Sequence, residues 1–214
     1  MRRFLFLTLL FPFLLNAQSV SLDFGQSSSS FIYKNSNGDE LDNLTNKWGD
    51  ILSIRYTHPF YYKPLLMCWG LQKNEYGARS LDAENNFSWD ISYVGINMGL
   101  DYTFDLLKMR DDSLASNNRL LTAVINTSLS HSWFTIGVQE INDRVYDLKE
   151  FDNNFNNLTK VQIGVGLLYG LYENTSFSLK YSFHRGLNNM ETDDQKLYLF
   201  AHHILFGIVI DLKK

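Results

Sequence analysis

Residues 161–186 read "VQIGVGLLYGLYENTSFSLKYSFHRG", and this stretch indicates the fold. Apolar residues alternate with small or polar residues on both sides of "YENT". The apolar positions are Val161, Ile163, Val165, Leu167, Tyr169, Leu171, Phe177, Leu179, Tyr181 and Phe183. Because successive side chains on a β-strand point to opposite faces, the pattern predicts a β-hairpin with one apolar and one polar face.

The same alternation recurs along the rest of the chain. Including the two strands of the hairpin, the alternating segments cover residues 20–33, 48–56, 65–71, 87–104, 121–138, 161–171, 177–183 and 198–210. Several of them exceed ten residues, whereas strands of soluble proteins cluster near 5–6 residues. The sequence therefore predicts an all-β protein with eight long strands.

Two segments change phase along their length. In segment 87–104 the apolar residues are odd-numbered up to Tyr93 and even-numbered from Val94 onward. One additional residue would produce this change, so we predict a β-bulge near Tyr93 and Val94. Segment 121–138 shows a similar slip before Phe134.

The connections between segments alternate in length. Those after the first, third, fifth and seventh segments are long and polar, and those after the second and sixth are tight. Long loops at one rim and short turns at the other are typical of outer-membrane barrels, in which the short turns face the periplasm. The connection at residues 106–119 is too long for such a turn. We expect it to hold a short helix or to contact an envelope protein partner.

Alternation alone fits two kinds of protein, a barrel in lipid and a soluble secreted β-sandwich. Aromatic residues near the segment ends favour lipid, because aromatic belts form where a lipid layer meets water. The predicted periplasmic belt contains Phe60, Tyr61, Tyr102, Phe104, Tyr169 and Tyr172. The opposite belt contains Trp48, Phe87, Trp89, Trp133, Tyr181, Phe183, Tyr198 and Phe200. We expect an eight-stranded antiparallel up-and-down transmembrane β-barrel.

The first residues resemble a secretory signal. Arg2 and Arg3 precede an apolar run at residues 4–15 that is too short to span a bilayer, and small Ala17 follows. We therefore predict a signal peptide at residues 1–17 and the outer-membrane β-barrel domain at residues 18–214. Without Arg2 and Arg3, 17 basic residues stand against 23 acidic ones. This acidic balance argues against nucleic-acid binding.

The polar face of such a barrel points into the lumen. Eight strands leave an interior only wide enough for side chains. We predict that Gly95, Gly99, Gly164 and Gly166 make room for longer neighbours. The inward charges are expected to be Asp23, Arg55, Asp90, Asp101 and Lys180. These charges should pair with one another and plug the lumen.

Three motifs carry a family resemblance. "VGINMGLDYTF" at residues 94–104, the hairpin at 163–183 and "RGLNNM" at 185–190 resemble the small outer-membrane β-barrel family, close to OmpA-like and PorT-like barrels. The resemblance covers the mature chain and implies the fold and an outer-membrane location. It implies no single activity, because such barrels include anchors, adhesins, plugs and enzymes. The ending "GIVIDLKK" departs from the terminal aromatic of the family, and we expect no peptidoglycan-binding domain after the last strand.

An enzymatic alternative is a barrel that modifies lipid A or phospholipid. The deacylase type of such barrels resembles a His-x-Ser pair, but here Ser132 directly follows His131 and points to the opposite face. His184 is interpreted as a hydrogen-bonded lumen residue. His202 and His203 alternate faces and so cannot bind one metal together. Among these residues we predict no catalytic, cofactor-binding or metal site.

The remaining polar features are interpreted as structural. Cys68 is the only cysteine, and we interpret it as a small apolar strand residue with no basic neighbour on its own face. The acidic loop "NNMETDDQ" at residues 188–195 lacks the ligand spacing of a calcium loop. We expect a non-enzymatic barrel without cofactors, with outer-membrane lipid and lipopolysaccharide as partners. Its specificity would reside in its extracellular loops.

Overall fold

The computed structural model describes residues 19–34, 44–60, 64–80, 87–108, 119–151, 157–172, 174–188, 190–192 and 195–212. The predicted signal peptide and residues 109–118 of the long connection lie outside these ranges. Among the described residues, no helix is long and apolar enough to cross a membrane.

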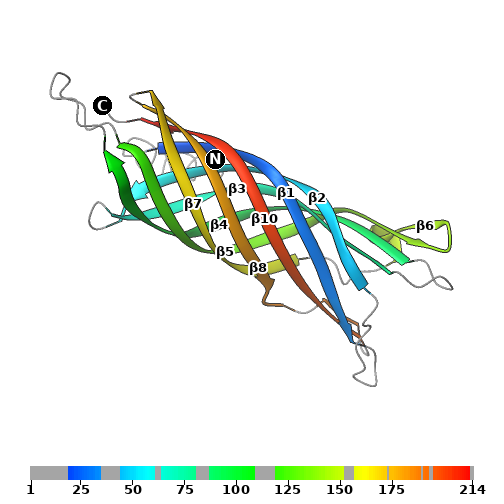
Figure 1. The fold of residues 1–214 in the computed structure, drawn as a ribbon. Helices are drawn as coiled ribbons and strands as arrows, with labels where there is room; N and C mark the ends of the chain where they lie inside the picture. The colour runs from blue at the N-terminus through cyan, green and yellow to red at the C-terminus, as the bar shows by residue number, and fades with distance from the viewer. Residues whose placement is uncertain are drawn as a thin grey trace, which may run out of the picture.

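Eight long antiparallel strands form one closed sheet (Figure 1). They are β1 Ser19–Lys34, β2 Leu44–Pro59, β3 Leu65–Ser80, β4 Phe87–Lys108, β5 Arg119–Ile141, β7 Asn157–Tyr172, β8 Thr175–Gly186 and β10 Gln195–Asp211. Each pairs with the next in this order, and β1 pairs with β10 to close the barrel. The predicted eight-stranded up-and-down barrel is confirmed. The alternative of a two-sheet β-sandwich is wrong, because the strands form one closed sheet.

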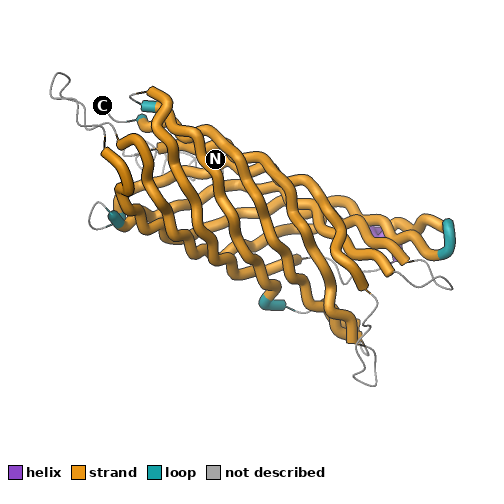
Figure 2. Tube along the Cα trace, in the orientation of Figure 1, coloured by secondary structure: helices purple, strands orange, loops and turns teal. Residues whose placement is uncertain are grey.

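Three short elements extend the barrel at one end. β6 Arg144–Asp147 pairs with β5, α2 Leu148–Phe151 follows β6, and β9 Met190–Thr192 pairs with β10. Figure 2 shows that strand accounts for nearly all of the described chain. The turn after Ile141 places Asn142 and Asp143 at φ of 49° and 64°, a region that Asn and Asp tolerate better than most residues.

The two ends of the barrel differ. The terminal rim contains Ser19 and Asp211, which face each other across the β1–β10 pair, and the tight turn between β7 and β8. The loop rim, at the other end, carries β6 and the ends at which β1, β3, β5 and β8 finish (Figure 1). A tilted strand of about 9–11 residues spans a bilayer. With 22 residues in β4 and 23 in β5, the barrel is taller than a bilayer requires.

The polarity of the two faces inverts between the ends. In the half next to the terminal rim, large apolar side chains such as Leu22, Phe24 and Ile54 are exposed outside, while Ser21 and Asp23 are buried inside. In the half next to the loop rim, the interior holds an apolar core. Its members are Phe31, Tyr76, Ala78, Ile91, Tyr93, Leu148, Leu158, Leu199 and Ala201.

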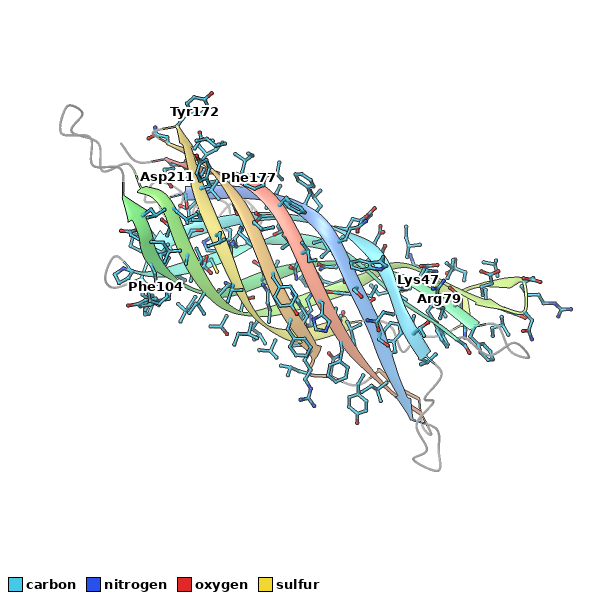
Figure 3. All side chains as sticks on the ribbon, in the orientation of Figure 1. Lys47, Arg79, Phe104, Tyr172, Phe177 and Asp211 are labelled. Carbon is cyan, nitrogen blue, oxygen red and sulfur yellow. The ribbon has the colours of Figure 1, made fainter. Side chains whose placement is uncertain are left out.

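The outer face of the loop half carries ion pairs as well as exposed apolar side chains such as Trp48 and Ile136. Lys47 Nζ lies 2.7 Å from Asp90 Oδ2, and Lys73 Nζ lies 2.8 Å from Glu75 Oε1. Figure 3 places Lys47 in this half and Phe104 and Tyr172 near the terminal rim. The barrel therefore has an apolar outside at one end and an apolar inside at the other.

The β-bulge predicted in β4 near Tyr93 and Val94 is wrong, and this inversion of polarity explains why. Ile91 and Tyr93 are buried inside and Val94 is exposed outside, so the facing of β4 does not change there. The register with β3 is continuous from Ser88 to Tyr102. The apolar phase changes because the first part of β4 contributes to the core and the later part to the outer apolar face. Trp89 likewise packs against the core, so its predicted place in an outer aromatic belt is wrong.

The additional residue belongs to β5. Ser92 pairs with Ile136, whereas Tyr93 pairs with Phe134, which leaves Thr135 without a facing residue. The Thr135 hydroxyl donates to the Ser92 carbonyl at 2.9 Å. The slip predicted before Phe134 therefore occurs after it, at Thr135, and Phe134 itself packs against the core.

Candidate functional site

Two ion pairs occupy the lumen of the terminal half. Lys180 Nζ donates to both carboxylate oxygens of Asp23 at 2.8 Å, and Ser178 donates to the same carboxylate at 3.0 Å. Arg55 Nη1 lies 3.3 Å from Asp101 Oδ2. The predicted inward position and pairing of these four charges are confirmed.

Neutral side chains surround the second pair. Asn126 donates to the Asp101 carboxylate, and the Cys68 thiol lies 3.5 Å from it. Gln162 donates to the Asn126 carbonyl at 3.0 Å. Each buried carboxylate therefore has both a cation and neutral donors, which a buried ion pair requires to offset its lost hydration.

The expectation for Asp90 is wrong. Its side chain is exposed on the outer face and accepts from Lys47, whose alkyl chain crosses Gly77. The error has the same origin as the predicted bulge. Without a change of facing in β4, the even-numbered Asp90 lies outside together with Val94.

Cys68 has no basic neighbour on the same face of its own segment, but the closed sheet brings Arg55 close to it. The thiol is buried in the lumen beside the Asp101 carboxylate that Arg55 contacts. Arg55 comes from β2, a different strand, so inspection of the segment around Cys68 could not reveal it.

The predicted glycines do make room in the lumen. A Cβ added at Gly95 would lie 2.3 Å from Ser132 Oγ, and one at Gly166 would lie 3.0 Å from Lys180 Cγ. Gly99 and Gly164 meet lumen side chains in the same way.

A second polar group lies between the ion pairs and the apolar core. We call it the lysine layer, and it consists of Tyr76, Lys160, His184 and His203. Lys160 is fully buried and its ammonium donates to the Tyr76 hydroxyl. The Tyr76 ring stacks on His203 at 5.9 Å between centroids, and His203 stacks on His184 at 3.6 Å. Ser182 Oγ lies 2.9 Å from His184 Nε2, as expected for a hydrogen-bonded lumen histidine.

Sequence reasoning missed Lys160 and Tyr76. The alternation of β7 carries a usable signal, because Lys160 shares the inward face of Gln162 and Gly164. Tyr76 lies on β3, far from β7 in sequence. The closed sheet alone brings the two side chains together.

The remaining histidine predictions concern the faces on which His131, His202 and His203 lie. His131 Nδ1 lies 2.9 Å from Thr159 Oγ1 outside, while Ser132 is buried inside. His202 contacts the Tyr181 hydroxyl at 2.7 Å outside, while His203 is buried inside. Both predicted alternations of facing are confirmed. Among the described residues, no three His, Cys, Asp or Glu side chains are grouped to hold a metal ion.

The connection between β5 and β7 packs into the barrel at the loop rim through Leu148. Leu148 of α2 is 2% exposed and belongs to the apolar core, and Asp147 accepts a hydrogen bond from the Lys149 backbone N–H at 2.8 Å. The connection between β5 and β7 thus inserts a side chain into the barrel at this rim.

Comparison with known proteins gives structural likeness only. No protein-family model and no curated protein sequence matches the chain. Among solved structures, Neisserial surface protein A is 11% identical over 91% of this chain and 96% of its own, with a TM-score of 0.45. Ail of Yersinia pestis is 13% identical over 89% and 99%, with a TM-score of 0.35. The N-terminal β-barrel domain of OprF from Pseudomonas aeruginosa is 14% identical over 89% and 98%, with a TM-score of 0.40. The likeness of these three proteins to this chain concerns the fold alone.

Proposed function

We propose that this protein is an integral outer-membrane β-barrel with a plugged lumen and a structural or interaction role. The observation that supports it is the exposed apolar surface around the terminal half. Phe24, Met98 and Ile163 are 58%, 63% and 60% exposed there. Burial of one such side chain is worth about 1.5–3 kcal/mol, so a continuous ring of them favours lipid over water.

The rim assignment follows from this surface. The predicted signal peptide at residues 1–17 directs export, the terminal rim faces the periplasm, and the loop rim faces outward. The charged outer face beyond the apolar ring suits the aqueous side. The loops there, held on a rigid sheet, carry the interaction role.

Lipid and lipopolysaccharide are the proposed partners of the outer face. Arg185 is exposed beside the aromatic side chains of β8 and β10, and its guanidinium lies 5.6 Å from the Phe200 ring centroid. Among the described residues, no carboxylate pairs with it. A cation in this aromatic border fits an anionic lipid headgroup. An envelope protein that contacts residues 106–119 is retained as a further proposed partner.

The role is proposed to be non-enzymatic. His184 is buried in the lumen between the core and the ion pairs, away from the lipid-facing surface. His131 lies outside, and the serine next to it is inside. Ser182 Oγ lies 2.9 Å from His184 Nε2, but both side chains are buried and no hydrogen bond from a described residue to His184 Nδ1 orients the ring as a triad requires.

Cell fractionation tests the membrane assignment. We expect the mature protein in the outer-membrane fraction, resistant to salt and carbonate washes and released by detergent. Recovery in a detergent-free wash contradicts the proposal. Acyl release from lipopolysaccharide by the purified barrel, lost in His131→Ala or His184→Ala, would establish the enzymatic alternative instead.

A further inference from the structure

A cavity of about 40 Å³ lies in the lumen near the ion pairs. Its lining includes Arg55, Gln72, Asn97, Lys180 and His203. A water molecule needs about 10–15 Å³ of such cavity volume, so the cavity has room for one small ion together with water.

Several lining groups are buried donors without a partner. Arg55 uses Nη1 for Asp101 and leaves Nε unpaired. Asn97 donates to the Gln72 carbonyl at 3.4 Å, which leaves Gln72 Nε2 unpaired. His203 Nε2 has no partner either. Gln72 is 5% exposed and His203 is 1% exposed, so bulk water does not satisfy them.

Among the described residues, buried basic side chains in the lumen outnumber buried carboxylates. The three basic side chains are Arg55, Lys160 and Lys180, and the two carboxylates are Asp23 and Asp101. Lys180 is paired with Asp23 and Arg55 with Asp101, so both carboxylates already have a basic partner. Lys160 has the Tyr76 hydroxyl as its hydrogen-bond partner, and Tyr76 stacks on His203 at the cavity wall.

From the unpaired donors, the excess basic side chain and the volume, we propose that the cavity binds one small monovalent inorganic anion of chloride size. Arg55 Nε and Gln72 Nε2 donate to it, and His203 donates through Nε2 in the corresponding tautomer. The ion balances the charge of Lys160 in the adjacent layer. In a low-dielectric interior, neutral water would satisfy the donors but leave this charge uncompensated.

Anomalous diffraction with bromide tests the site directly. Crystals of the detergent-solubilised barrel grown in sodium bromide should show one bromide within hydrogen-bond distance of Arg55 Nε and Gln72 Nε2. An ordered cavity without an anomalous peak overturns the proposal and implies that Lys160 is uncharged.

Thermal unfolding in detergent provides an independent measurement. At constant ionic strength, replacing gluconate by chloride should raise Tm saturably, by about 3–6 °C at ten times the dissociation constant, because gluconate exceeds the cavity volume. Gln72→Leu and Lys160→Met should lose the chloride-specific rise. Lys73→Met, on the outer face beside Gln72, should retain it. A rise of equal size in all four proteins is an effect of chloride on the exposed surface and contradicts the internal site.

Discussion

Lys180 and Asp23 face each other inside a closed barrel, where neither side chain has water to replace its partner. Their side chains are 12% and 3% exposed. Removal of one partner from a buried pair leaves an uncompensated charge, which is far more destabilising than removal of both. The exposed Lys73–Glu75 pair has no such constraint, because water hydrates either residue alone.

We therefore expect Lys180→Met to lower the free energy of unfolding by about 3–5 kcal/mol. Addition of Asp23→Leu to this variant should recover much of the loss. Lys73→Met, the matched control, should change stability by about 1 kcal/mol or less. Urea unfolding of the barrel in detergent or liposomes measures all of these. Equal losses from Lys180→Met and Lys73→Met would mean that the lumen is hydrated.

Individual strands differ in how far their sequence reveals them. The alternation on β7 and β8 locates both strands and the inward Lys180, since one face is apolar throughout. β4 misleads, because its apolar residues line the core near Tyr93 and the outer face from Val94 onward. Periodicity reports which side is apolar and does not report which side is inside. The missed Lys160–Tyr76 contact depends on pairing between distant strands, which local alternation does not contain.

At the same scale, the connection with β6 and α2 depends on Leu148 for its attachment to the core. Leu148→Ala should open this segment, because truncation of a buried leucine costs about 2–5 kcal/mol. We expect chymotryptic cleavage after Tyr146 to accelerate by about tenfold or more.

Val145→Ala is the control for this experiment, because Val145 lies on the same segment and is 69% exposed. Its cleavage rate should equal that of the wild type, and the rest of the barrel should stay intact in both variants. Equal rates in Leu148→Ala and Val145→Ala would show that Leu148 does not hold the segment in place.

For the whole molecule, the side chains that fill the lumen predict that the barrel does not conduct ions. Ion pairs, the lysine layer and the apolar core follow one another along its length. We expect no steady ohmic conductance in a planar bilayer. Persistent current that Lys180→Met or Arg55→Met alters would contradict the plug.

The rim assignment predicts which connections are outside the cell. In a Cys68→Ser background, Asn154→Cys should react with a membrane-impermeant thiol reagent on intact cells, and Asn174→Cys should not. The two sites flank β7 and so fall on opposite sides of the membrane. Labelling of Asn174→Cys alone reverses the orientation, and equal labelling of both contradicts a spanning barrel.

The pairing of β1 with β10 also predicts the order in which the strands pair during folding. Hairpins such as β7–β8 join residues close in sequence, whereas the seam joins Ser19 to Asp211. Contacts of such large separation form slowly, because the whole intervening chain must first be ordered. Until then β1 and β10 present unpaired backbone groups, which lipid does not tolerate. During refolding, a thiol cross-linker should therefore join Ile163→Cys to Phe183→Cys well before it joins Ser28→Cys to His202→Cys. Simultaneous cross-linking would mean that the sheet closes in a single step.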